Sequence, residues 1–332
     1  MSEDQPLLEV ENLHVSFPIR KGFFQRTVGA VQAVNGVSFS VPRGTSFGLV
    51  GESGCGKTTV ARAVLQLVEP TAGAIRFDGE DVAKMDAVAL NRFRGRVQAV
   101  FQDPFSSLNP RMSTGRIISE PLRVHRLTPE SQIKAEVARL LDMCGLPARF
   151  ADLYPHEMSG GQRQRVGIAR ALAMKPELIV CDEAVSALDV SIQAQIINLL
   201  EDLQKELNLT YLFIGHDLSV VRHICDQVAV MYLGRIAETA PSDPLFAAPR
   251  HPYTQALIDA VPNPDPDYEA GRHIAPLEGE VPSPANPPSG CFFHPRCPLV
   301  TDRCRQEAPH LDPVAPAHFA ACWETAQTVP AE

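Results

Sequence analysis

Residues 51–58 constrain the fold of this chain more than any other segment. Their sequence, GESGCGKT, fits the phosphate-loop pattern G-x-x-x-x-G-K-[ST] at every fixed position. The apolar run 46–50 before them is typical of a buried strand, and residues 58–65 after them have the composition of a helix. A strand, a glycine-rich loop and a helix in this order are the context in which the pattern binds nucleotide phosphates.

Each part of this loop has a chemical reason to contact phosphate. Glycine adopts backbone conformations that other residues avoid, so backbone N–H groups can point at phosphate oxygens near the positive end of the helix. We expect Lys57 to contact the β- and γ-phosphates and the Thr58 hydroxyl to ligate Mg²⁺. The predicted ATP-binding residues here are Gly51, Glu52, Ser53, Gly54, Cys55, Gly56, Lys57, Thr58 and Thr59.

Two further apolar runs end in polar residues that suit phosphate chemistry. The run 178–181 is followed by Asp182 and Glu183, and the run 211–215 is followed by His216. Such runs are typical of parallel strands, and ligands of open α/β sheets bind beyond the carboxyl ends of those strands. We expect Asp182 to associate with Mg²⁺, Glu183 to activate water as a general base, and His216 to contact the γ-phosphate.

Two more segments complete the predicted chemistry. Gln102 follows the strand-like run 97–101 and is a candidate to sense Mg²⁺ and the attacking water. Residues 159–162 read SGGQ and lead into the helical pattern 163–172. A serine hydroxyl, bare glycine N–H groups and a helix N-terminus suit a phosphate. A helix N-cap without a ligand would explain Ser159 but not the whole set.

These motifs together resemble those of a known family. Gln102, SGGQ, Asp182-Glu183, the SALD segment 186–189 and His216 stand in the order and spacing of the ABC-type ATPases. The chain resembles the ATP-binding subunits of bacterial importers, most closely the di-/oligopeptide permease branch. The resemblance implies that Ser159, Gly160 and Gly161 cap the γ-phosphate of ATP bound to the opposite subunit. Gln162 and Asp189 are further predicted ATP-binding residues.

The chain departs from the common family pattern beside the predicted base and at the adenine. Ala184 stands where proline usually follows the base, and proline would have fixed φ there, so we expect an effect on catalytic rate rather than on binding. The family places an aromatic ring for adenine near Val28, where this chain has none. Phe17, Phe23 or Phe24 must then supply the ring.

The expected fold class is α/β: a three-layer phosphate-loop ATPase core with an inserted helical subdomain and an irregular proline- and cysteine-rich C-terminal extension. Residues 1–235 are predicted to form the nucleotide-binding domain, with the helical subdomain at about 103–172. Of 29 prolines, 18 fall in residues 236–332, so this extension is predicted to lack a regular α/β layer.

Four of the eight cysteines lie in the tail, with the spacing C-x5-C-x6-C-x17-C: Cys291, Cys297, Cys304 and Cys322. In a cytosolic chain, thiols or metal ligands are expected rather than disulfides. Four thiolates suit tetrahedral Zn²⁺ or an iron–sulfur cluster, and the resemblance favours [4Fe–4S]. Nearby histidines leave mixed zinc ligation open, and four unligated cysteines packed against the core are the remaining interpretation.

Composition excludes several other classes of protein. The net charge of −9 argues against broad nucleic-acid binding, which needs clustered positive charge. No apolar window approaches the ~20 residues that span a bilayer, and the acidic N-terminus lacks a signal-peptide core. Together with the resemblance, this predicts a peripheral protein at the cytoplasmic face of the inner membrane, held there by permease subunits.

The predicted function is to bind and hydrolyse ATP and thereby power an ABC importer of dipeptides or oligopeptides. The resemblance implies several partners: a second, non-identical ATPase subunit, two membrane permease subunits, and an extracytoplasmic solute-binding protein reached through the permease. No nucleic-acid partner is expected. Residues just past Gln102 are either a groove for the permease's coupling helix or ordinary loop packing: Phe105, Leu108, Pro110, Arg111 and Met112.

Two alternative functions remain open from the sequence. One is a soluble ABC ATPase acting in DNA repair or translation, although such proteins usually carry coiled-coil inserts or tandem domains and this chain has one phosphate loop. The other is a regulatory ATP-binding module with weak hydrolysis, which Ala184 makes conceivable.

Overall fold

The computed structural model describes residues 5–22, 26–103, 107–261, 277 and 279–325. The chain divides into two compact units, each assembled from separate stretches of sequence. Unit 1 comprises residues 1–8, 41–46 and 76–214, and unit 2 comprises residues 9–40, 47–75 and 215–332.

Unit 2 contains five strands of a mixed sheet, in the order β11–β12–β10–β9–β3. Strands β3 and β9 are parallel, and the other neighbours are antiparallel. Every residue of β3 is buried, as the apolar run predicts for a central strand. The bounds are β3 Ser46–Val50, β9 Gln227–Tyr232, β10 Arg235–Pro241, β11 Asp312–Ala315 and β12 His318–Ala320.

Among the described residues, the rest of unit 2 comprises a second group of strands, several helices and a 3₁₀ turn. The strands follow the order β2–β1–β4, with bounds β1 Leu8–Lys21, β2 Arg26–Val41 and β4 Ala72–Phe77. Leu8, Val41 and the last two residues of β4 belong to unit 1. The helices are α1 Lys57–Val64, α8 Leu218–Ile224, α9 Ser242–Ala247, α10 Pro252–Asp259, the 3₁₀ turn η4 His294–Arg296 and α12 Asp302–Gln306.

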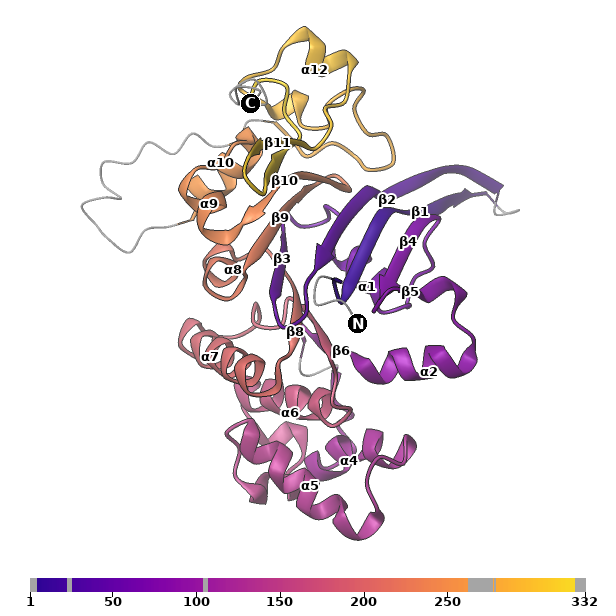
Figure 1. Cartoon of the computed structure of the whole chain (residues 1–332), viewed down its shortest axis with the longest axis vertical. Coiled ribbons are helices and arrows are strands. Elements are labelled where there is room, and N and C mark those ends of the chain that lie inside the picture. The colour runs from indigo at the N-terminus through magenta and orange to yellow at the C-terminus, as the bar shows by residue number, and fades with distance from the viewer. Residues whose placement is uncertain (1–4, 23–25, 104–106, 262–276, 278, 326–332) are drawn as a thin grey trace, which may run out of the picture. The chain divides into compact units, whose positions relative to one another are not determined.

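The C-terminal extension is more regular than the proline content predicted, because β10, β11 and β12 add to a sheet (Figure 1). Pro313 is tolerated in β11 since that strand lies at the sheet edge, where one N–H can be missing. A buried carboxylate joins these strands. Glu238 of β10 accepts hydrogen bonds from the backbone N–H groups of Arg250 (2.7 Å) and His251 (2.8 Å), and contacts Nε2 of His318 in β12 at 2.6 Å.

Unit 1 contains three parallel strands in the order β8–β7–β6. Their bounds are β6 Val97–Phe101, β7 Leu178–Asp182 and β8 Thr210–Gly215, and they confirm three of the predicted apolar strands. The short strand β5 (Glu80–Asp81) pairs antiparallel with the end of β4. The helices outside the inserted region are η1 Val82–Lys84, α2 Ala87–Arg96 and α7 Val190–Leu207.

Residues 114–172 of unit 1 are largely helical (Figure 1). Apolar side chains three to four residues apart on α4 and α5 are buried, as in an amphipathic pair: Ile117, Ile118, Leu122, Ile133, Val137, Leu140 and Leu141. The bounds are α4 Thr114–Val124, α5 Glu130–Met143, η2 Ala148–Asp152, η3 Pro155–Glu157 and α6 Gly160–Leu172. Within the part of the chain that the structure describes, no helix is both long enough and apolar enough to span a bilayer.

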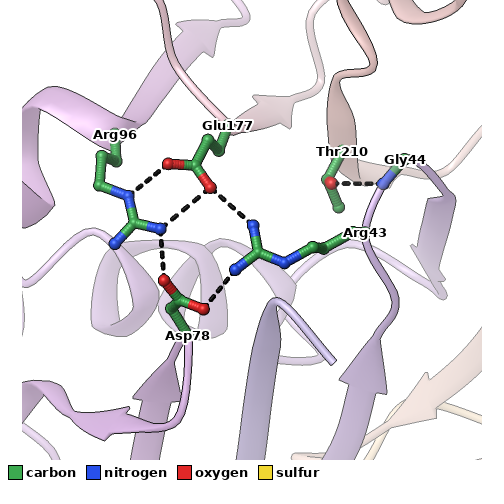
Figure 2. Close-up of polar contacts among 6 residues, drawn as sticks. All are labelled: Arg43, Gly44, Asp78, Arg96, Glu177 and Thr210. Carbon is green, nitrogen blue, oxygen red and sulfur yellow. Dashed lines mark hydrogen bonds and ion pairs between the residues drawn. The ribbon is translucent and has the colours of Figure 1, made fainter. Parts of the chain in front are cut away.

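A network of four charged side chains connects distant stretches of unit 1 (Figure 2). The Arg96 guanidinium donates to Glu177 and, at 2.6 Å, to Asp78, while Arg43 donates to the same two carboxylates. Hydrogen bonds from Arg96 lower the pKa of Glu177, and burial, which raises the pKa of Asp78, is outweighed by its two arginine partners. The network therefore holds the start of β7 against the segments that flank β4 and β6.

Candidate functional site

The phosphate loop, residues 51–58, connects β3 to α1 in unit 2. Two of its glycines are sterically required. Gly51 has φ 150°, and a Cβ at this position would lie 2.2 Å from the carbonyl oxygen of Met231. Gly56 has φ 111°, and a Cβ at this position would lie 2.2 Å from the carbonyl oxygen of Ala33. Only glycine fits such close backbone approaches. The motif's spacing therefore reflects packing against β9 and β2 as well as ligand chemistry.

Lys57 is the first residue of α1 and is buried. Its ammonium group donates to the carbonyl oxygens of Gly51 (2.8 Å) and Glu52 (2.9 Å) within its own loop. The Cys55 sulfur lies 3.7 Å from the same nitrogen, and burial raises the pKa of that thiol. A buried cation facing the loop interior is what a site for phosphate oxygens requires.

The predicted carboxylates lie where β7 ends in unit 1. Asp182 is the last residue of that strand and pairs with Phe101 of β6, so Gln102 and Glu183 each directly follow a paired residue. Glu183 has φ 50°, in the left-handed region that costs a non-glycine residue energy. Its N–H donates to the Ile214 carbonyl at 2.8 Å, which helps to hold this conformation. A strained backbone at a candidate base is typical of functional sites.

His216 follows β8 directly after Gly215, as the strand pattern predicted, and belongs to unit 2. Thr58 and Thr59 lie in the first turn of α1 and are half-buried. The roles predicted for these three residues stay predictions.

The SGGQ segment begins α6 as a capping box. The Ser159 hydroxyl accepts from the Gln162 N–H (3.3 Å), and the Gln162 side chain accepts from the Ser159 N–H (2.9 Å). A Cβ on Gly161 would lie 2.4 Å from Cγ2 of Ile192 in α7, so glycine is needed for helix packing. Asp189 is the N-cap residue of α7, its side chain is exposed, and it makes no capping hydrogen bond.

The structure also bears on the predicted groove for a coupling helix and on the ring predicted to stack on adenine. Leu108 is 1% exposed, so it packs in the interior instead of lining a surface groove, whereas Pro110 and Arg111 are exposed. Phe17 in β1 is 43% exposed and available for stacking. Phe23, Phe24 and Phe105 lie outside the described residues.

The four tail cysteines are not joined in disulfide bonds in this structure. Burial raises the pKa of Cys291, and it raises that of Cys297 to about 11. Over the described ranges, no group of three or more histidine, cysteine, aspartate or glutamate side chains is arranged to hold a metal ion. Ligand geometry therefore gives the predicted zinc or iron–sulfur centre no support.

Sequence reasoning missed two residues that contact the phosphate loop. The hydroxyl of Tyr253 in α10 accepts from the Glu52 N–H, and the guanidinium of Arg296 in η4 donates to the Glu52 carboxylate. Both lie in the C-terminal extension, some two hundred residues from the loop, and neither belongs to a local pattern. The only available signal was the His-Pro-Tyr helix start at residues 251–253.

Two family models match the chain. The ABC transporter family matches residues 34–186, and the family described as the oligopeptide/dipeptide transporter C-terminal region matches residues 237–304. The first match covers the phosphate loop, the SGGQ segment and the end of β7, and the second covers both Tyr253 and Arg296.

Curated relatives are similar along almost the whole chain. A probable peptide ABC transporter ATP-binding protein of Sinorhizobium fredii is 55% identical over 95% of this chain and 89% of its own length. The oligopeptide transport ATP-binding protein AppF of Bacillus subtilis is 52% identical over 97% of this chain and 98% of its own. A putative peptide import ATP-binding protein of Brucella ovis is also 52% identical, over 96% and 98%.

Solved ABC ATPases have the same fold, which confirms the predicted α/β phosphate-loop ATPase core. CbiO1 of Clostridium perfringens, part of the ABC transporter complex CbiONQ, aligns with a TM-score of 0.64 at 29% identity, over 74% of this chain and 92% of its own. The ATP-binding cassette MJ0796, solved as a dimer in a post-hydrolysis state with ADP and Pi, aligns at 0.63 and 26% identity, over 71% and 98%. The chain therefore belongs to the ABC transporter ATP-binding proteins, in the oligopeptide/dipeptide transporter group.

Proposed function

We propose that this ABC ATPase binds and hydrolyses ATP to power the import of dipeptides or oligopeptides. The observation that carries the proposal is 52–55% identity, over at least 95% of the chain, to proteins named for peptide or oligopeptide transport. The matched C-terminal region, residues 237–304, supports the same group. Since the similarity includes both the phosphate loop and the extension, the proposal concerns the whole chain.

In this proposal residues 51–59 bind the phosphates of ATP. Lys57 would exchange the two loop carbonyls that it now contacts for β- and γ-phosphate oxygens, because an anionic acceptor makes the stronger hydrogen bond. The Thr58 hydroxyl, the Asp182 carboxylate and the Gln102 amide are the hard oxygen donors that Mg²⁺ prefers, and they would hold that ion. Bound Mg²⁺ neutralises charge on the phosphate oxygens.

Hydrolysis is assigned to two polar residues beyond the strands. The Glu183 carboxylate would accept a proton from the attacking water, and the His216 imidazole would contact the γ-phosphate. The left-handed backbone of Glu183 supports the base assignment, because proteins retain such strain chiefly at functional sites.

Ser159, Gly160 and Gly161 would cap the γ-phosphate of ATP held by an opposite ATPase subunit, and Gln162 and Asp189 would also bind ATP. In the capping box the Ser159 oxygen accepts a bond, so its own O–H proton can still be donated to phosphate. The N–H groups of Gly160 and Gly161 are in the first turn of α6, where a helix attracts anions. We propose a non-identical ABC subunit as the partner.

We further propose the full transporter context. Two permease subunits would form the membrane pathway, an extracytoplasmic solute-binding protein would deliver the peptide, and this chain would be peripheral at the cytoplasmic face of the inner membrane. The exposed residues Pro110 and Arg111 are available to contact a permease. The support for this context is membership of the peptide transporter group.

The [4Fe–4S] or Zn²⁺ proposal for the tail rests on the number and spacing of its four cysteines, Cys291, Cys297, Cys304 and Cys322, and not on ligand geometry. Iron, zinc and acid-labile sulfide should be measured after anaerobic purification, and absence of all three would eliminate the proposal.

The two alternative functions have less support. Relatives named for peptide transport along the whole chain disfavour a DNA-repair or translation factor. Ala184 directly follows the strained Glu183, which is the reason to consider a weakly hydrolysing regulatory module. The steady-state ATPase rate distinguishes this alternative from a transporter ATPase.

Peptide uptake in a strain that lacks this subunit tests the proposed function. Uptake of a labelled oligopeptide should be lost in the deletion strain and restored by the wild-type gene. The control is Arg303→Gln, an exposed side chain of the extension, which should restore uptake fully. Equal peptide uptake with and without the subunit would show that the peptide assignment is wrong.

A further inference from the structure

Glu52, the second residue of the phosphate loop, is held through its side chain and both of its backbone polar groups. Its carboxylate accepts two hydrogen bonds from the Arg296 guanidinium, at 2.8 and 3.1 Å. Its N–H donates to the Tyr253 hydroxyl at 2.9 Å, and its carbonyl accepts from the Lys57 ammonium at 2.9 Å. All these residues belong to unit 2, and two of the three partners come from the C-terminal extension.

The two partners from the extension are themselves rigidly placed. The Tyr253 side chain is fully buried, and its ring packs with those of Tyr232 and Phe293 at centroid distances of 4.7 and 5.4 Å. The rings of Tyr232 and Phe293 also contact each other, at 5.3 Å. An aromatic cluster of this kind fixes the Tyr253 hydroxyl in position before any ligand arrives.

The charged pair is also well shielded from water. The side chain of Arg296 is 7% exposed and that of Glu52 is 26% exposed. The bidentate hydrogen bond with Glu52 raises the pKa of Arg296, so the guanidinium stays charged. A bidentate pair shielded in this way is stronger and more directional than a surface ion pair.

We propose that Tyr253 and Arg296 are positioning residues for the ATP phosphate loop, through which the C-terminal extension sets the affinity for ATP. This inference rests on the proposed binding of ATP by residues 51–59. When Lys57 turns to phosphate it releases the Glu52 carbonyl, and the two extension residues still hold Glu52 in place. The loop then keeps its N–H groups directed at the ligand.

The physical basis is preorganisation. A loop that binds through backbone N–H groups has to be ordered, and a loop that is disordered beforehand loses affinity by ordering on binding. A merely structural link between extension and loop would change the melting temperature alone. A positioning role predicts a weaker ATP affinity at an unchanged rate of hydrolysis when ATP saturates.

Tyr253→Phe is the mildest test, since it removes only the hydroxyl from a fully buried ring. The Kd for a non-hydrolysable ATP analogue should rise about threefold, as expected for one hydrogen bond, and the Glu52 amide should exchange faster with deuterium. The matched control is Tyr211→Phe, which removes a buried hydroxyl that donates to the Leu200 carbonyl at 2.9 Å in unit 1. It should lower stability and leave the Kd unchanged.

A double-mutant cycle tests the charged pair. Arg296→Gln and Glu52→Gln should each raise the Kd about tenfold, and the double variant should be no worse than either, because both remove the same interaction. The KM for ATP should rise with kcat changed by less than about twofold. Arg303→Gln, which removes an exposed ion pair of the same extension, is the control and should leave both constants at wild-type values.

Three outcomes are decisive. Weaker affinity in the Tyr253 and Arg296 variants, with the controls unchanged, supports the inference. Wild-type affinity in folded Tyr253→Phe and Arg296→Gln overturns it, even if both melt at a lower temperature. If the wild-type chain itself does not bind the ATP analogue, the proposed function fails, which is a different result. Circular dichroism of each variant establishes that it is folded.

Discussion

At the scale of single residues, Glu183 combines a carboxylate with a left-handed backbone, φ 50°, directly after the strand that ends in Asp182. The Ser186 hydroxyl donates to the Glu183 carbonyl at 3.0 Å, and the Glu183 N–H is bonded to Ile214. Both backbone groups are therefore satisfied in this unusual conformation.

Replacing Glu183 by Gln separates binding from hydrolysis. Glutamine has the same shape but accepts no proton, so ATP should still bind while steady-state turnover falls by about two to four orders of magnitude. Phosphate release by the purified transporter is the measurement. Turnover within about twofold of wild type would identify another residue as the base.

Lys57→Ala should weaken nucleotide binding directly. The variant removes the buried ammonium that the loop surrounds, and the loss of a charged hydrogen-bond donor is expected to be about 2 kcal/mol, or about thirtyfold in Kd. Equilibrium titration with Mg·ATP measures it. The control Lys84→Ala removes an exposed lysine paired with Asp81 and should bind ATP as wild type does.

Most of the phosphate loop could be predicted at this scale, because Gly51, Gly56 and Lys57 belong to one contiguous pattern. The contacts of Tyr253 and Arg296 with Glu52 could not, since they depend on how distant segments pack. The left-handed backbone conformation of Glu183 could not be predicted either, because Ala184 after it does not indicate a constrained turn.

At the scale of elements, His251 shows how the extension depends on pH. It is the N-cap residue of α10, and its Nδ1 accepts from the Tyr253 N–H at 3.0 Å. Burial lowers its pKa from the ordinary 6.5 to about 4. The unfolded chain therefore binds more protons than the folded chain between these values. Stability should be fully present above pH 6.5 and should decrease as the pH falls toward 4.

His251→Asn should remove this dependence. Asparagine still caps a helix but does not titrate, so the loss of about 3 kcal/mol between pH 6.5 and 4 should shrink. Urea unfolding across this pH range is the measurement, with the exposed His310→Asn as the control. A variant that keeps the wild-type slope would show that another group is responsible.

A strand or helix could be predicted where its own residues form a clear local pattern. The buried strands β3, β6, β7 and β8 follow from apolar runs, and α6 follows from its start at Ser159. The strands β11 and β12 were missed, because four- and three-residue strands carry too little pattern and Pro313 argued against one of them. They are strands because β12 pairs with β10, next to the buried contact of Glu238 with His318, and β11 pairs with β12.

At the scale of the whole molecule, family membership follows from a combination of motifs, none of which identifies the family alone. The phosphate loop alone indicates a nucleotide-binding protein, whereas its combination with SGGQ and the residues after β7 and β8 indicates an ABC ATPase. The division into two units built from interleaved stretches was not predictable, because it depends on long-range packing. The predicted boundary between residues 235 and 236 stays a prediction.

The central claim is that ATP hydrolysis by this chain drives peptide import, and transport into proteoliposomes tests it most directly. Vesicles containing the permease subunits, the partner ATPase and this chain would be given a labelled oligopeptide, the solute-binding protein, and ATP or ADP. We predict repeated uptake with ATP, and uptake no greater than with ADP when this chain carries Glu183→Gln. Wild-type uptake by the Glu183→Gln complex would contradict the account.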